Sequence, residues 1–149
     1  MADTQIQTSP VISKQAESST KKKRQFSFVR QIDSSDCAAA CLSMVAQHFD
    51  IDLVLSEARI SCGGDATGLE ICSAAQEIGL EASFHRKSYG SVKDLTFPVI
   101  AHWEGGHWVV FLEAKNDSIK IADPAAGVYW LKDVEAEAAY SGYICKFKA

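Results

Sequence analysis

The 149-residue sequence has no apolar run that approaches the roughly 18–20 residues of a membrane-spanning helix. Its longest apolar stretches have the length of strands, so we expect these residues to be soluble by themselves. Residues 1–20 lack the apolar segment of a secretory signal, and no signal peptide is expected. The five cysteines are odd in number and contain no C-x-x-C pair, which argues against a disulfide framework and favours a reducing compartment.

Residues 1–25 contain no aromatic side chain and are rich in Ser, Thr, Gln and Lys, so we predict a disordered basic tail. The basic run over residues 21–24 is interpreted as a solvated charge run, with attraction to an anionic membrane surface or RNA as the alternative. The rest of the sequence is acidic, since residues 31–149 hold nine basic and 17 acidic side chains. This balance disfavours nucleic acid as a partner and is compatible with a cationic peptide.

Residues 26–149 are long enough for one domain with its own core. Hydrophobic spacing of three to four residues predicts helices over 36–49, 52–60 and 67–78, and the third opens with a capping box from Thr67 to Glu70. From Leu80 the period changes to two, which predicts strands near 82–87, 97–103, 107–113, 118–122, 128–131 and 143–147, with a short helix over 133–140. The pattern is typical of an α+β fold in which N-terminal helices pack on a mostly antiparallel sheet.

The first helix begins in a way that favours a reactive thiol. Ser34, Ser35 and Asp36 are all good N-cap residues, and Cys37 follows them in the first helical turn. The unpaired backbone N–H groups and the positive end of the helix dipole favour a thiolate there. Cys37 is therefore a candidate nucleophile, although a cysteine on an apolar helix face is also a common core residue.

A histidine and a carboxylate follow in the order of a papain-type triad. His107 begins an apolar strand after two glycines, and Asp123 ends the next strand. Each has an ordinary structural interpretation, a histidine at a core rim and an Asp-Pro turn. Of the other histidines, His48 is assigned to a helix end and His85 to the surface, whereas His102 neighbours the candidate site.

The sequence resembles the peptidase domain of bacteriocin-processing ABC transporters. That domain is a papain-like cysteine peptidase. The resemblance covers residues 29–149 and includes Gln31, Asp36-Cys37, Cys41-Leu42, Gly64 to Gly68-Leu69, Pro98 to Trp103, His107 to Val110 and Ala122 to Pro124. Two positions depart from the usual pattern, Ala38 where glycine is common and Trp108 where phenylalanine is common.

The resemblance implies a catalytic role for each of several motif residues. Cys37 would attack the scissile carbonyl, His107 would pair with the thiolate and protonate the leaving amine, and Asp123 would fix the imidazole. The Gln31 side chain and the Cys37 backbone N–H would hold the oxyanion. No metal or cofactor is implied for this domain. Contacts with substrate are expected from Gly68, Trp103, Gly106 and Trp108.

The resemblance also implies partners and a place in the cell. The substrate would be a precursor peptide with an amphipathic helical leader, cleaved after a double-glycine-type pair. The domain would work with the membrane and ATPase domains of an ABC transporter, and ATP would be needed only there. This arrangement implies the cytoplasmic face of the bacterial inner membrane.

Other functions remain open on the residues alone. A leader-docking module without catalysis is the main alternative, because docking needs the groove and not the thiol. Acyl transfer to an amine would use the same triad. Redox chemistry at Cys37 and Cys41 lacks a C-x-x-C motif, and a metal site from these cysteines and His107 lacks the usual zinc-ligand spacing.

Overall fold

The computed structural model describes residues 26–149, and the predicted basic tail, residues 1–25, lies outside the described residues. In chain order the elements are α1 (Cys37–His48), α2 (Leu55–Cys62), α3 (Gly68–Glu77), β1 (Glu81–Arg86), α4 (Tyr89–Lys93), β2 (Val99–Trp103), β3 (His107–Ala114), β4 (Ser118–Asp123), β5 (Gly127–Lys132), α5 (Asp133–Ala139) and β6 (Tyr140–Lys148). No helix within 26–149 has the length and apolar character needed to cross a bilayer.

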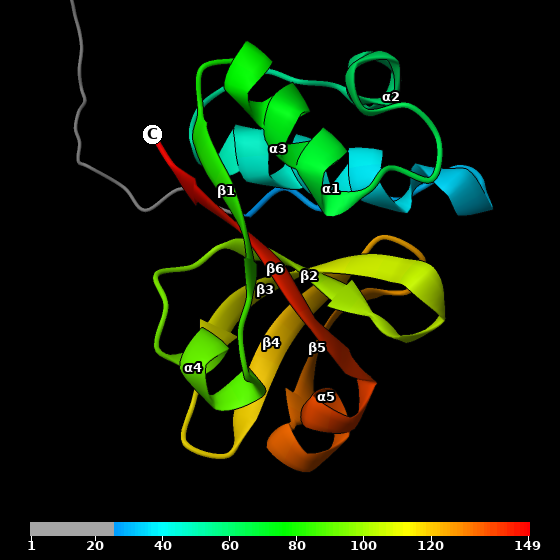
Figure 1. Ribbon diagram of the computed structural model, residues 1–149. Helices are drawn as coiled ribbons and strands as arrows, with labels where there is room; N and C mark the ends of the chain where they lie inside the picture. The colour runs from blue at the N-terminus through cyan, green and yellow to red at the C-terminus, as the bar shows by residue number, and fades with distance from the viewer. Residues whose placement is uncertain (1–25) are drawn as a thin grey trace, which may run out of the picture.

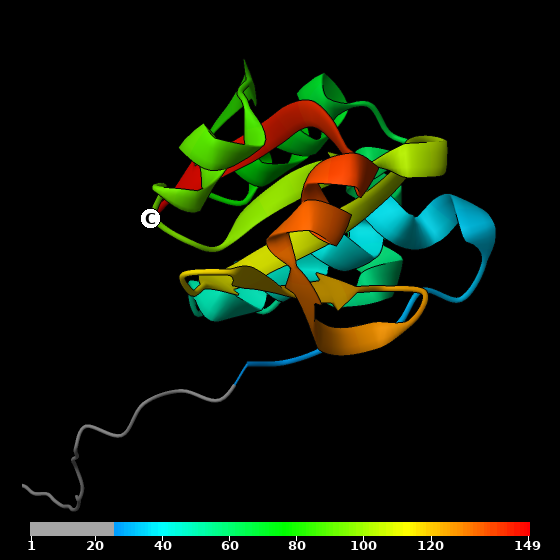
Figure 2. The ribbon, with the colours of Figure 1, turned by 90° about the horizontal axis from the view of Figure 1, so that it is seen from below.

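The strands form one sheet in the order β1-β6-β2-β3-β4-β5, and every neighbouring pair in it is antiparallel. Helices α1, α2 and α3 lie together on one side of the strands, whereas α5 lies on the other (Figure 1). Seen from below, α5 is in front of the strands and α1 is behind them (Figure 2). The predicted α+β class, with N-terminal helices on an antiparallel sheet, is confirmed.

Two buried clusters lie on opposite faces of the sheet. We call the first the helix-side core, because α1, α2 and α3 pack there on sheet residues such as Ile100 and Val110. The second, the opposite core, joins α4 and α5 to Val99, Phe111 and other sheet residues. Adjacent positions of one strand thus alternate between the two cores, as the predicted period of two requires.

Helix α1 is the central element of the helix-side core. Residues 37–46 are all buried, and the run Ala38 to Ala40 is at most 1% exposed, so neighbouring elements approach its backbone closely. A helix that is buried around most of its circumference is held in place by its surroundings rather than by its own propensity. Its first residue, Cys37, is therefore fixed relative to the sheet.

The structure differs from the predicted start of α1. A short 3-10 turn, Ser34–Asp36, precedes the helix, and the side chain that caps this turn is Asp33. Asp36 occupies the N-cap position of α1 but makes no capping hydrogen bond, because its carboxylate is used elsewhere. The predicted capping box of α3, in contrast, is confirmed, with Thr67 and Glu70 each accepting the other's backbone N–H.

Candidate active site

Cys37 lies at the N-terminus of α1 and is only 5% exposed, but it borders a pocket. The 3-10 turn before it brings the chain in from the surface, and the backbone N–H groups of the first helical turn lie around the thiol. Cys41, one helical turn later, is fully buried in the helix-side core, and burial raises the pKa of its thiol well above the usual value. The two cysteines therefore differ in access to a ligand.

The structure brings His107 and Asp123 together. His107 is the first residue of β3 and Asp123 the last of β4, and these strands are antiparallel neighbours. The His107 Nε2–H donates to Asp123 Oδ1 at 2.6 Å. Both side chains are mostly buried, with 21% and 12% exposure, so the bond is only weakly screened by water. Because Nε2 is used here, Nδ1 is the ring nitrogen left for Cys37.

The surroundings of His107 stabilise its charged form. Its pKa is raised to about 9, first by the hydrogen bond with Asp123 and then by hydrogen bonding with Cys37, against the opposing effect of burial. The structure thus places all three predicted triad members within one interacting group. At neutral pH the imidazole is protonated, which is the state that pairs with a thiolate.

Asp123 is held by more than the histidine. Its Oδ1 also accepts the backbone N–H of Ala125 at 2.9 Å, and the Tyr129 hydroxyl is a further hydrogen-bonding partner. Burial acts to raise the pKa of Asp123, but the bonds from His107, Ala125 and Tyr129 lower it below the ordinary value. Asp123 is therefore ionised when it faces the imidazole. Tyr129 was not identified from the sequence.

The backbone of Gln31 is hydrogen-bonded next to the triad. Its N–H donates to the carbonyl of Pro124 at 3.0 Å, directly after Asp123. The side-chain Nε2 donates to the carbonyl of Asp33 at 3.2 Å, and Oε1 is buried without a hydrogen-bond partner. The amide thus lies in the loop that leads to Cys37, and its role as an oxyanion donor stays a prediction.

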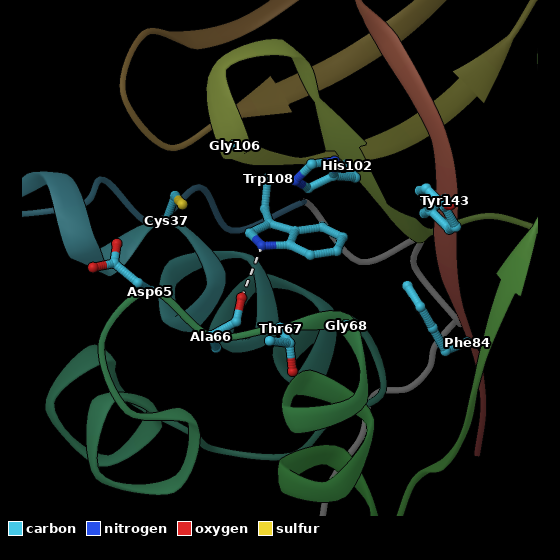
Figure 3. A pocket seen from close by; sticks show the side chains of 10 residues that line it. All are labelled: Cys37, Asp65, Ala66, Thr67, Gly68, Phe84, His102, Gly106, Trp108 and Tyr143. Atoms are coloured by element: carbon cyan, nitrogen blue, oxygen red, sulfur yellow. Dashed lines mark hydrogen bonds between the residues drawn. The ribbon is translucent and has the colours of Figure 1, made fainter.

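A pocket of about 390 Å³ begins at Cys37. In Figure 3 Cys37 and Asp65 lie at one end, Phe84 and Tyr143 at the other, and the Trp108 indole between them. Three of the four predicted substrate-contacting residues border it, namely Gly68, Gly106 and Trp108; the remaining lining residues are Ala66, Thr67 and His102. The indole N–H of Trp108 donates to the carbonyl of Ala66 at 3.1 Å, which joins the sheet to the loop before α3.

Trp103 is not among the residues that border the pocket. It is buried in the opposite core, where its ring packs edge-on against Phe111. The reason is strand alternation: His102, its neighbour on β2, faces the pocket, and Trp103 faces the other side of the sheet. The predicted contact of Trp103 with substrate is therefore corrected to a packing role.

Sequence reasoning missed the aromatic end of the pocket. The rings of Phe84 and Tyr143, from β1 and β6, are stacked with centroids 5.7 Å apart. His102 packs edge-on against Trp108, and its buried Nδ1 has no hydrogen-bond partner. Burial lowers the pKa of His102, so this ring is neutral at pH 7. Only Phe84 carried a local signal, as an apolar residue on the inward face of its strand.

Replacing Gly68 with alanine is expected to distort the pocket. A Cβ at Gly68 would lie 2.1 Å from Phe84 Cε1, so the ring must move. We expect a loss of about 1–3 kcal/mol in unfolding free energy and about tenfold weaker binding of a peptide seated there. Urea denaturation and fluorescence titration measure the two effects. Gly90→Ala is the control, because a Cβ there meets no atom within 4 Å; equal effects in both variants would contradict the prediction.

The rival redox and metal hypotheses both concern the cysteines. All five cysteines are free and buried. Within residues 26–149 no group of three His, Cys, Asp or Glu side chains is arranged to hold a metal ion. Cys72 on α3 and Cys145 on β6 are neighbours in the helix-side core. Neither lies on an element that carries a triad residue.

The comparisons with known proteins identify the family. A model of the peptidase C39 family matches residues 25–149. A double glycine motif protease from an AMS/PCAT transporter, solved with a leader peptide, is 31% identical with a TM-score of 0.80, over 87% of this chain and 95% of that one. The peptidase domain of Streptococcus ComA is 25% identical with a TM-score of 0.76, over 83% of this chain and 98% of that one.

Curated relatives agree. The colicin V secretion/processing ATP-binding protein of Escherichia coli is 26% identical over 123 residues, which are 80% of this chain and 18% of the relative. The lactococcin-G-processing and transport ATP-binding protein of Lactococcus lactis subsp. lactis is 31% identical over 108 residues, 66% of this chain and 15% of the relative. The sequence thus spans less than a fifth of these relatives. It belongs to the peptidase C39 family of cysteine peptidases.

Proposed function

We propose that this chain is a cysteine endopeptidase that removes the leader of a bacteriocin or a related ribosomal peptide after a double-glycine-type pair. The observation that carries the proposal is the hydrogen bond between His107 and Asp123. Cys37 contributes with Asp123 to the raised pKa of that histidine and borders an apolar pocket. A docking module needs only the pocket. A nucleophile with a protonated imidazole and an ionised carboxylate beside it is the arrangement by which a cysteine peptidase cleaves a peptide bond.

The proposed reaction assigns a step to each of these groups. The Cys37 thiolate attacks the carbonyl carbon, and the electron pair moves to the oxygen, which the Cys37 backbone N–H and the Gln31 amide stabilise. His107 gives the Nδ1 proton to the leaving nitrogen, which leaves as the amine, and an acyl-enzyme remains. Water, deprotonated by the same nitrogen, then releases the acid. Asp123 holds the ring with Nδ1 towards the sulfur throughout.

Substrate choice follows from access to the sulfur. Cys37 is 5% exposed, so a peptide must bring its backbone close to the protein surface to meet the sulfur, which favours glycine on the acyl side. The far end of the pocket offers Phe84 and Tyr143, with Trp108 between them and Cys37 (Figure 3), and Leu69, which follows the pocket residue Gly68 in the chain, is 67% exposed. These groups suit the apolar anchors of an amphipathic helical leader. The AMS/PCAT relative, a double glycine motif protease solved in complex with the leader peptide, supports the same substrate class.

The wider assembly is part of the same proposal. The curated relatives are named as secretion, processing or transport ATP-binding proteins. We therefore place this domain beside the membrane and ATPase domains of an ABC transporter, at the cytoplasmic face of a bacterial inner membrane. ATP would act in those domains, and the proposed peptidase step draws on the residues of this domain and on water.

Incubation with leader peptides tests the proposal. The purified chain is mixed with a precursor peptide whose amphipathic leader ends in Gly-Gly. A second sample holds the same precursor with Val-Val at the end of the leader. We expect cleavage of the first alone, into two products whose masses sum to that of the substrate plus one water. An added amine in the product would instead indicate acyl transfer, and binding without any product would indicate a docking module.

A further inference from the structure

The residue directly before the nucleophile is a buried carboxylate that the mechanism above does not use. Asp36 is 3% exposed, and its side chain meets the guanidinium of Arg59 from α2. The Arg59 Nε–H donates to Asp36 Oδ1 at 2.8 Å and an Nη2–H donates to Oδ2 at 2.7 Å. This parallel pair is the most directional contact between a guanidinium and a carboxylate. It anchors the start of α1 to α2.

The same carboxylate also shapes the loop that leads to Cys37. Asp36 Oδ2 accepts the backbone N–H of Ile32 at 3.1 Å and that of Asp33 at 3.0 Å. In return, the Asp36 N–H donates to the Asp33 carbonyl at 3.1 Å, and the same carbonyl accepts the Gln31 amide at 3.2 Å. One buried side chain therefore closes the loop between Gln31 and the nucleophile.

The loop is fastened at two further points of the site. The Gln31 N–H bonds the Pro124 carbonyl, next to the triad aspartate, and the N–H of Asp65, which borders the pocket, bonds the Ser35 carbonyl at 3.2 Å. A small displacement of the loop would consequently move both groups assigned to the oxyanion. Misplacement by about 1 Å can lower a catalytic rate by about 100-fold.

We propose that Asp36 and Arg59 form a clamp of two positioning residues that sets the distance between the Gln31 amide and the Cys37 backbone N–H, and with it the oxyanion hole. The inference rests on the proposed function. Arg59 has a second effect, because it neutralises a carboxylate one residue from a nucleophile that reacts as an anion. The bond with Arg59 lowers the pKa of Asp36 to about 2, so the clamp is charged at every pH at which the enzyme would be assayed.

The test separates transition-state binding from substrate binding. Arg59→Met is compared with the unchanged chain for cleavage of the Gly-Gly peptide, for inhibition by a peptide aldehyde of the same sequence, and for binding of the uncleaved peptide in the Cys37→Ala background. The aldehyde forms a tetrahedral adduct whose oxygen occupies the oxyanion position. We expect kcat and aldehyde affinity each to fall about 10- to 100-fold, with the peptide Kd within about twofold.

Two further variants make the result decisive. Arg59→Lys keeps the charge and should recover part of the loss, and Glu57→Gln, an exposed charge change on the same helix, should leave all three measurements unchanged. If Arg59→Met is unfolded at the assay temperature, Asp36→Asn is judged by the same criterion. Unchanged kcat, or equal losses of aldehyde and peptide binding, would overturn the inference. Absence of cleavage by the unchanged chain would overturn the proposed function instead.

Discussion

Replacing Cys37 with alanine is expected to abolish peptide cleavage while leaving leader binding intact. The substitution removes the sulfur that forms the acyl-enzyme but keeps the helix, the pocket wall and the backbone N–H. Loss of a nucleophile that works together with a histidine lowers kcat by at least about 10⁴-fold. Mass spectrometry of the products measures the first effect, and titration with a fluorescent leader peptide measures the second.

Cys41→Ala is the matched control for that experiment. Cys41 lies one turn further along α1 and is fully buried, so its loss should cost stability but leave the cleavage rate within about twofold. Cleavage retained by Cys37→Ala would reject Cys37 as the nucleophile. Equal loss of cleavage in both variants would show that the effect comes from packing of the helix.

Asp123→Asn should have the second-largest effect, and it should depend on pH. The bond with Asp123 is the main reason that the pKa of His107 is about 9, so removal of the charge should move that pKa down towards the ordinary value near 6.5. The imidazolium that protonates the leaving amine is then lost at lower pH. We expect the alkaline limb of the pH–activity profile to shift to lower pH. The kcat should be about 10- to 100-fold lower near pH 8.5, with a smaller loss near pH 6.5.

The titration of His107 can be followed directly by the NMR signals of its ring protons. The shift also has a consequence for stability, because the folded state holds the proton more tightly than the unfolded state. That contribution is complete below the unfolded pKa of about 6.5 and is lost as the pH rises through about 9. Asp117→Asn is the control, because the side chain of Asp117 is 76% exposed. It should change neither the pH–activity profile nor the His107 titration. A His107 titration unaltered in Asp123→Asn would contradict the assigned pairing.

Much of the fold was predictable because its signals are local. The capping box at Thr67, the change of hydrophobic period near Leu80 and the order of the three triad candidates are all readable along the chain. They sufficed for the fold class, whereas the family was expected from the resemblance of several motifs. Strand alternation was equally readable between His102 and Trp103, and applying it would have placed Trp103 on the face away from the pocket.

The rest depends on contacts between distant segments. Asp36 and Arg59 are 23 positions apart, and nothing in the residues around either one indicates that they pair. The approach of Phe84 to Gly68 likewise arises only when sheet and helices are assembled. Tyr129, in contrast, reaches Asp123 across the short turn between β4 and β5. A sequence shows which side chains are chemically capable, whereas the packing decides which of them meet.

The bond from the Trp108 indole to the Ala66 carbonyl has a consequence for how a ligand enters. It ties strand β3 to the loop before α3, on the lining of the pocket, and phenylalanine, the commoner residue at this position in the family resemblance, has no N–H to make it. We expect a pocket pinned in this way to keep its width when empty. A leader peptide would then cost little conformational entropy on the protein's side, and recognition would fall mainly on the fit of the peptide itself.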